Sequence, residues 1–510
     1  MNKFKEKTTL NPVMTFLILI LFTILLSGFL HLLGFEATYN KIDITTGEYT
    51  ATSESVESLL SLSGIKYIFT STVSNFTAFT PLSSLIIVLI GIGIMEKSGF
   101  IKTTFTILTK YCKKYTITFW LVFISILLSI SGDLGYVAMI PIAALMFGYG
   151  RRNPILGIVA VYAALTCGSG LSVLLTAVDS DMMRYTLANA NNIDANYVLT
   201  TSAFTFIMTA AIIVSSIAIT IITERFSSQN VVHYEFKDDK KELRLGRREY
   251  RGLLFSITAG AIYLLIFIYN IIPGLPFSGN LLDYSQNFYI DKLFSYNSFF
   301  SNGFVFIVTM FFIILGLFYG IGAKTIKNNN DFSEDLTHSL DGTGRTLILI
   351  LLASILINVF KKSNIGTVIT IRLANILNNG NITGVPLIVI LFLITAVSTL
   401  FLTGSSARWS IISTTAIPTF MNNSLSPEFA QVISRFGECM TIGITPLLAY
   451  FVVYLAYIEK YNQEEEPVPL FKTLKYQLIY GLVIGAILLV LLVGWYLIGL
   501  PIGITGKIGT

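Results

Sequence analysis

Charged residues are scarce in this chain of 510 residues: Asp, Glu, Lys and Arg make up 12% of it, whereas 54% of the residues are hydrophobic. Soluble globular domains are about 25% charged, so this composition excludes an ordinary soluble protein. Apolar runs of about 18 or more residues recur along the chain, and a helix of about 20 such residues crosses the hydrocarbon core of a bilayer. The composition therefore predicts an all-α, polytopic protein of the plasma or inner membrane.

Cysteine and histidine are also rare, with three residues of each. Cys112, Cys167 and Cys439 lie in or beside apolar segments without metal-ligand spacing, so we expect neither a disulfide nor a metal site. No His-x-x-x-His, paired aspartates or Ser/His set occurs at membrane depth, which argues against an intramembrane enzyme. The sequence also lacks the repeated motif that would line the pore of a channel, which argues against a channel. The net charge of +5 gives no indication of a nucleic-acid partner, and no cofactor is expected.

The positions of the basic residues predict the orientation, because cytoplasmic loops are enriched in Lys and Arg. Basic clusters at 102–114 and 225–251 mark the cytoplasmic side, whereas the loops 35–64 and 179–197 carry few basic residues and are expected outside. This pattern places the N-terminus in the cytoplasm and the C-terminus outside. About nine spans are predicted, at 14–34, 81–95, 154–178, 199–223, 253–272, 303–321, 347–360, 431–451 and 478–497.

Two further apolar segments are interrupted in the middle by small or polar residues. The segment 116–150 is broken around Gly132 and Asp133, and the segment 385–420 around Gly404. Each half of the first segment has roughly 14 residues, which is too short to cross the bilayer alone. Both segments are therefore predicted to form re-entrant hairpins.

The two halves of the chain share an order of features. Each hairpin precedes, by roughly 35 residues, a span that is broken by glycine, at Gly168 and at Gly437. Inverted repeats of this kind, with a solute site near the midplane, are typical of secondary transporters. We expect a first repeat, a basic cytoplasmic linker and a second repeat at 1–224, 225–251 and 252–510.

Arg435 and Glu438 lie one helical turn apart inside a predicted span, where charged side chains are unfavourable and usually functional. One interpretation is an intrahelical pair whose members only neutralise each other. The other is a substrate site, in which the planar guanidinium of Arg435 binds a carboxylate and Glu438 exchanges a coupling proton.

Several polar or aromatic residues near the two hairpin tips have two interpretations each. Asp133 either caps the half-helix 134–147 or takes part in ion coupling. Trp409 is either an interfacial anchor or a platform for an aryl ring in a cavity. Ser405 and Ser406 either begin a helix whose N-terminus attracts an anion or only allow close helix packing.

At these residues the sequence resembles the aminobenzoyl-glutamate transporter (AbgT) family over nearly the whole chain. The resemblance implies nine spans, two hairpins and a homodimer of bowl-shaped subunits. It also implies transport of p-aminobenzoyl-glutamate, or export of sulfonamide-like antimetabolites, driven by a proton or sodium gradient. The motifs that carry it are Glu96-Lys97-Ser98-Gly99, Asp133-Leu134-Gly135-Tyr136, Ser406-Ala407-Arg408-Trp409, similar to the family's Ser-Ala-Lys-Trp, and Arg435 to Pro446.

The resemblance also implies which residues form the site. Glu438 stands where the family has Asp, and Ser172 and Ile442 stand where it has Asn, so Ile442 offers no ligand to an ion. Ion coupling is expected to involve Asp133, Ser172 and Glu438. The positions expected to bind substrate are Asp179, Ser405, Ser406, Trp409, Arg435, Glu438 and Pro446.

These observations predict a secondary active transporter for an organic anion with an aromatic or acylated amino-acid group. It would work by alternating access, with the hairpins and broken spans moving against the rest of the protein. Import and efflux both use these features. A dicarboxylate or short-chain carboxylate carrier remains the alternative, because Arg435 would also suit such a substrate.

Overall fold

The computed structural model describes residues 10–173, 176–200, 202–236, 246–286, 289–294, 297–378 and 382–509 of the chain. Within these ranges almost all regular structure is helical, and the only sheet has two strands. The predicted all-α polytopic fold is confirmed.

Eight helices in the described part of the chain are long and apolar enough to cross a membrane. All but one coincide with a predicted span. The exception is Lys114–Ser131, the first half of the predicted hairpin 116–150. At 18 residues this helix is long and apolar enough to cross a membrane, so the expectation that both halves are too short was wrong. The eight are Pro12–Leu32, Leu62–Lys97, Lys114–Ser131, Thr205–Asn230, Arg247–Ile271, Phe299–Ala323, Gly344–Lys362 and Leu470–Ile498.

Each predicted hairpin consists of two helices around a non-helical or 3-10 tip. The first contains α5 (Lys114–Leu128) and α6 (Asp133–Tyr149), and the second contains α17 (Gly384–Thr399) and α18 (Ser405–Asn422). At the first tip Gly132 has φ +57°, a backbone conformation that glycine adopts without strain.

The two broken spans are shorter helices that end inside the protein. The first is α7 (Pro154–Gly168). The second is α19 (Pro427–Thr441), which is followed by an irregular stretch and then by α20 (Phe451–Tyr461). Both α7 and α19 are buried along most of their length, so their breaks are surrounded by protein, as backbone breaks at membrane depth require.

The glycines of the broken spans allow equivalent close contacts in the two halves. A Cβ on Gly168 would lie 2.8 Å from the Ile126 carbonyl oxygen of α5, and a Cβ on Gly437 would lie 2.5 Å from the Phe392 carbonyl oxygen of α17. In each half, therefore, the broken helix packs directly on the backbone of the first helix of its hairpin.

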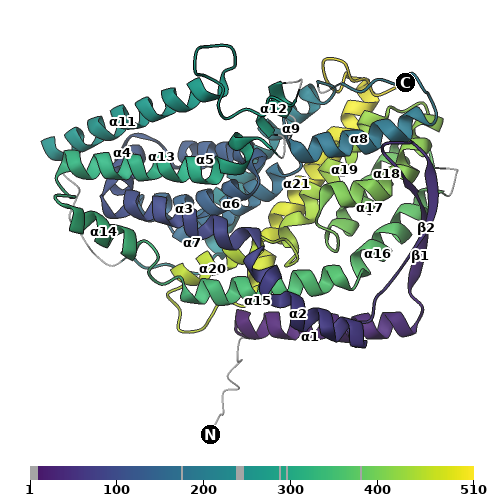
Figure 1. Cartoon of the computed structure of the whole chain (residues 1–510), viewed down its shortest axis with the longest axis horizontal. Helices are drawn as coiled ribbons and strands as arrows, with labels where there is room; N and C mark the ends of the chain where they lie inside the picture. Colours follow the sequence, from purple (N-terminus) through teal and green to yellow (C-terminus); the bar gives the residue numbers. More distant parts are fainter. Residues whose placement is uncertain are drawn as a thin grey trace, which may run out of the picture.

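The remaining helices surround this arrangement (Figure 1). Figure 1 shows α11 and α13 side by side at one end of the molecule, and α16, α17 and α18 at the other. The bounds of the other helices of at least six residues are α1 Pro12–Leu32, α2 Leu62–Thr77, α3 Thr80–Lys97, α4 Phe100–Tyr111, α8 Ala177–Asn191, α9 Thr205–Ile222, α11 Arg247–Ile271, α12 Tyr289–Phe294, α13 Phe299–Ala323, α14 Asn329–His338, α15 Gly344–Lys362, α16 Ile365–Ala374 and α21 Leu470–Ile498.

A β-hairpin occupies the predicted loop 35–64. Its strands β1 (Glu36–Ile42) and β2 (Tyr49–Ser55) pair in antiparallel register and run along the outer edge of the end that contains α16 and α18 (Figure 1). The Tyr49 hydroxyl donates a hydrogen bond to Asn189 of α8 at 2.8 Å. The hairpin therefore connects the loop after α1 to the segment that carries Asp179.

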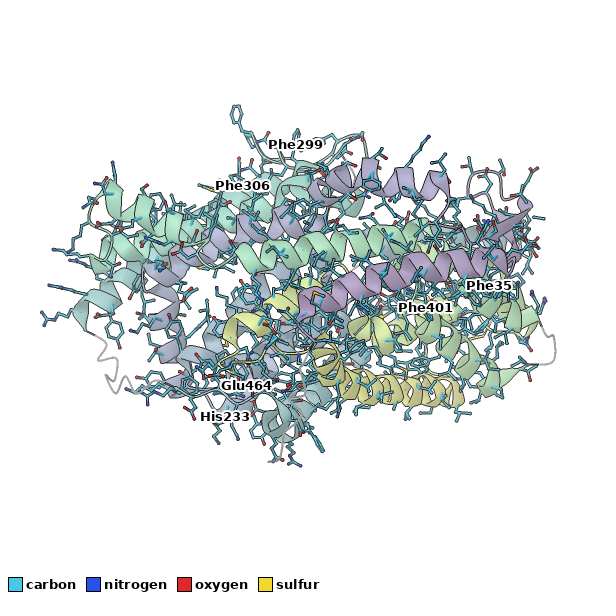
Figure 2. The ribbon with its side chains drawn as sticks, turned by 90° about the horizontal axis from the view of Figure 1, so that it is seen from below. Phe35, His233, Phe299, Phe306, Phe401 and Glu464 are labelled. Carbon is cyan, nitrogen blue, oxygen red and sulfur yellow. The ribbon has the colours of Figure 1, made fainter. Side chains whose placement is uncertain are left out.

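The predicted cytoplasmic linker 225–251 is described in part. Helix α11 begins at Arg247, and the segment before the gap lies beside the loop after α20, where Glu235 and Gln463 exchange hydrogen bonds of 2.8 and 3.0 Å. Figure 2 shows His233 and Glu464 of these two segments at the same edge of the molecule. The basic residues Lys237, Lys240, Lys241 and Arg244 lie outside the described residues.

The contact of Gly437 with α17 gives a test of this packing. We expect Gly437→Ala to lower the free energy of unfolding by about 1–3 kcal/mol, because the added methyl group meets a backbone carbonyl that cannot turn away. Thermal unfolding in detergent measures the effect. Gly494→Ala in α21 is the control, since a Cβ there has no neighbour within 4 Å among the described residues. Equal loss in both variants would contradict the predicted contact.

Candidate functional site

Four charged side chains are buried together where α8, α18 and α19 meet. Arg408 is 0% exposed, Arg435 and Glu438 are each 2% exposed, and Asp179 is 7% exposed. We call these four residues the charge cluster. Three of them were predicted from the sequence, whereas Arg408 was noted only as part of a motif.

Arg435 has partners on two other segments besides Glu438. Its Nε lies 3.0 Å from Asp179 Oδ1, its Nη1 donates to Glu438 Oε2 at 3.1 Å, and its Nη2 donates to the Ser169 carbonyl oxygen. An intrahelical pair with Glu438 therefore accounts for only one of these contacts. Arg435 joins α19 to α8 and to the end of α7.

Glu438 accepts hydrogen bonds from both arginines on one oxygen. Arg408 Nη2 lies 2.6 Å from Glu438 Oε2, the atom that also accepts from Arg435. The Ser169 hydroxyl lies 3.4 Å from the other oxygen, and the Ser405 side chain lies beside the same carboxylate. A carboxylate with two guanidinium partners is strongly favoured in its ionised form.

Asp179 has both a structural and an electrostatic contact. Its backbone N–H donates to the Thr176 hydroxyl at 3.0 Å, and its carboxylate accepts from the Thr176 backbone N–H at 3.2 Å. These two hydrogen bonds form a capping box at the start of α8. Its other oxygen faces Arg435. The capping box thus fixes the carboxylate that holds Arg435, and Asp179 is buried rather than solvated.

A small cavity adjoins the cluster on the side of Arg435. Its volume is only about 10 Å³, which is room for about one water molecule. The described conformation is therefore closed to a substrate at this point. The residues that line the cavity are Ser172, Val173, Asp179, Phe204, Met208, Gln431, Val432 and Arg435.

Trp409 is completely buried, so the interpretation as an interfacial anchor is wrong. Its indole N–H donates to the Thr186 hydroxyl of α8 at 2.9 Å, and that hydroxyl donates to Gln431 of α19 at 2.7 Å. In this conformation Trp409 holds three helices together and does not line the cavity beside Arg435.

The second hairpin tip lies against the break that contains Pro446. Thr445, next to Pro446, donates a hydrogen bond to the Leu400 carbonyl at 2.8 Å. Ser405 and Ser406 are half-buried and form the first turn of α18. Two of the residues predicted to bind substrate, Ser405 and Glu438, are in contact, whereas Pro446 follows the residue that is bonded to the end of the first helix of the hairpin.

Asp133 does not cap a helix through its side chain, so that interpretation is wrong: it is the first residue of α6, and Gly132 occupies the cap position. The Asp133 carboxylate faces Tyr450, whose ring stacks on Tyr136 with centroids 4.6 Å apart. The three residues predicted for ion coupling thus have different partners: Asp133 at the first tip, Ser172 on the cavity wall and Glu438 between two arginines.

Sequence comparisons agree on one family. A model of the AbgT putative transporter family matches residues 6–509. The p-aminobenzoyl-glutamate transport protein of Escherichia coli (strain K12) is 24% identical over 493 residues, which cover 97% of this chain and 93% of that protein.

Two solved structures are similar to the chain. The YdaH transporter of Alcanivorax borkumensis is 25% identical, with a TM-score of 0.49, and the match covers 97% of this chain and 100% of that one. MtrF of Neisseria gonorrhoeae, which is described as illuminating a class of antimetabolite efflux pumps, is 25% identical, with a TM-score of 0.49 and 98% coverage of both chains.

The structural role of Trp409 can be tested without substrate, because it depends on the hydrogen bond to Thr186. We expect Thr186→Val to destabilise the protein by about 1–3 kcal/mol, because the Trp409 N–H and the Gln431 oxygen lose their buried partner. Thermal unfolding measures this loss. Thr209→Val, at an exposed position of α9, is the control, and an unchanged unfolding midpoint for Thr186→Val would contradict the role assigned to the hydroxyl.

Proposed function

Because the chain belongs to the AbgT putative transporter family, we propose that it is a secondary active transporter of small organic anions and that the charge cluster recognises the anion. The observation that carries this proposal is Arg435: a guanidinium in the interior of a membrane protein, on the wall of a cavity and with part of its hydrogen-bonding capacity unused. Its planar fork matches a carboxylate.

The proposed substrate is p-aminobenzoyl-glutamate or a related acylated amino acid. The curated relative is named for transport of this compound, and its carboxylates suit Arg435. Efflux of antimetabolites is the second candidate, since MtrF is described as such a pump. A dicarboxylate or short-chain carboxylate would use the same guanidinium, so an uptake assay has to include compounds of each kind.

The proposed cycle is alternating access by two inverted repeats, at 1–224 and 252–510, joined by the linker 225–251. The equivalent contacts of Gly168 with α5 and of Gly437 with α17 support this division. Since the cavity beside Arg435 holds about one water molecule, the conformation corresponds to a closed step of the cycle, and the hairpins have to move before a substrate enters.

We also propose a plasma or inner membrane location, with the N-terminus in the cytoplasm and the C-terminus outside. Segments assigned to one side of the membrane are in contact with each other: Glu235 with Gln463 on the cytoplasmic side, and Asn192 with Gly47 on the outside, at 2.9 Å. A homodimer is proposed from the family resemblance.

The coupling ion is proposed to be a proton carried by Asp133. Glu438 is the less suitable carboxylate, because protonating it would leave two buried guanidiniums with one carboxylate, Asp179. Asp133 faces a tyrosine hydroxyl instead, and the described part of the chain contains no Lys or Arg side chain within 4.0 Å of it. A proton can therefore bind there without unpairing an arginine.

Uptake into proteoliposomes tests the function. We expect labelled p-aminobenzoyl-glutamate to accumulate under an imposed proton gradient, and Arg435→Lys to reduce uptake at least about tenfold, because a point-like ammonium cannot reproduce the planar contacts. A sulfonamide, succinate and acetate serve as competitors that separate the candidate substrates. If none of these compounds accumulates under a proton gradient or under a sodium gradient, the proposed function is contradicted.

Asp133→Asn tests the coupling residue. We expect loss of uptake driven by the proton gradient but retention of exchange between labelled and unlabelled substrate, because exchange requires no net movement of a proton. Glu57→Gln is the matched control: Glu57 lies in the loop before α2 and pairs with Lys362 at the C-terminal end of α15. Gradient-driven uptake that survives in Asp133→Asn would exclude this residue as the proton carrier.

A further inference from the structure

Arg408 is the member of the charge cluster to which the proposed function gives no task. It lies in the first turn of α18, directly behind the second hairpin tip, and its side chain is completely buried. It is not among the residues that line the cavity beside Arg435. Its position therefore suggests a role other than contact with substrate.

We propose that Arg408 is a positioning residue: it neutralises Glu438, so that Arg435 balances only one carboxylate, Asp179, and the cluster carries no net negative charge that would repel the substrate anion. This inference rests on the proposed function of the cluster. It assigns Glu438 to Arg408 and Asp179 to Arg435, which divides the cluster into two neutral pairs that meet at the shared oxygen Glu438 Oε2.

The distances support this division. The contact of Glu438 Oε2 with Arg408 is 2.6 Å, shorter than the 3.1 Å contact with Arg435, and charge-assisted hydrogen bonds strengthen as they shorten. Arg408 Nη1 donates to the Leu402 carbonyl at 2.8 Å, which holds the guanidinium in place. Among the described residues Arg408 Nε has no hydrogen-bond partner, so Glu438 and the Leu402 carbonyl are the two groups that position this side chain.

Charge balance explains why the cluster needs a second arginine. Two guanidiniums and two carboxylates sum to zero, and an unpaired charge in a buried site is strongly unfavourable. Without Arg408, Glu438 and Asp179 would both depend on Arg435, and the cluster would repel an anion. Protonation of Glu438 would restore neutrality, so the defect should be relieved in acid.

The other groups around Glu438 do not replace Arg408. Ser169 and Ser405 contribute hydroxyl groups, and α17 carries no ionisable side chain. The titratable or charged groups that face Glu438 are Arg408, Arg435, Tyr136 and the thiol of Cys439. Asp179 lies beside Arg435, and Cys167 lies beside Cys439.

The test compares Arg408→Gln with the double variant Arg408→Gln/Glu438→Gln in the full-length protein. Thermal unfolding in detergent and uptake of labelled p-aminobenzoyl-glutamate are measured at about pH 5.5 and about pH 8, a range in which an uncompensated buried carboxyl group titrates. Arg408→Gln should lose at least about tenfold in uptake at the higher pH and recover in acid. The double variant should be more stable than the single one and show no acid recovery.

A purely structural role gives a different result. If Arg408 only ties the hairpin tip to the Leu402 carbonyl, the added Glu438→Gln change cannot help. Equal defects in the single and double variants at both pH values would then overturn the proposal. Failure of the wild-type protein to take up any of the compounds would contradict only the proposed function. Thermal unfolding needs no substrate, so in that case it still tests whether Arg408 neutralises Glu438.

Arg152→Gln is the matched control variant. Arg152 pairs with the buried carboxylate of Glu224 between other helices, and its own side chain is 17% exposed. The same substitution therefore removes the guanidinium partner of a buried carboxylate outside the cluster. Uptake per folded protein by Arg152→Gln should keep the wild-type dependence on pH. An acid recovery as large as that of Arg408→Gln would show that loss of any buried arginine produces it, and would overturn the role given to Arg408.

Discussion

The interaction of both buried arginines with one carboxylate oxygen, Glu438 Oε2, is the contact on which the arrangement of the protein interior depends. An isolated charge is strongly unfavourable in a low-dielectric interior, so each of the four charges persists only because the others lie within ion-pair distance. Their partners come from α8, α18 and α19, and α8 lies far from the other two helices in the sequence. The positions of these helices are therefore set by electrostatics as well as by apolar packing.

The buried arginines also satisfy backbone carbonyl groups at the helix breaks. A helix that ends inside the protein leaves carbonyl oxygens without a helical donor. The Ser169 carbonyl at the end of α7 accepts from Arg435, and the Leu402 carbonyl at the second tip accepts from Arg408. Each arginine thus satisfies one broken backbone segment and one carboxylate, which explains how irregular backbone and buried charge are tolerated at the same place.

The sequence predicted the helical class, both hairpins and the pair Arg435 and Glu438, because hydropathy and charge at membrane depth are local signals. It missed the β-hairpin 36–55, whose strands are polar on both faces and lack an alternating pattern. Arg408, like Arg435, is a charged residue inside a predicted membrane segment. It was not singled out because it lies beside the hairpin tip rather than within an apolar run. The burial of Trp409 and the partners of Asp133 depend on contacts between distant helices, which periodicity does not encode.

The neutrality of the charge cluster constrains the proposed transport cycle. An anion that reaches Arg435 adds a negative charge to a site whose own charges sum to zero. A closed state with that extra charge is favourable only if a cation is bound as well. Asp133 lies on the other hairpin and outside the cluster, so in the proposed cycle a proton on Asp133 would compensate the charge without breaking an arginine pair. Coupling then follows from electrostatics: closure around the anion is favourable when the carboxyl group at the first tip is neutral.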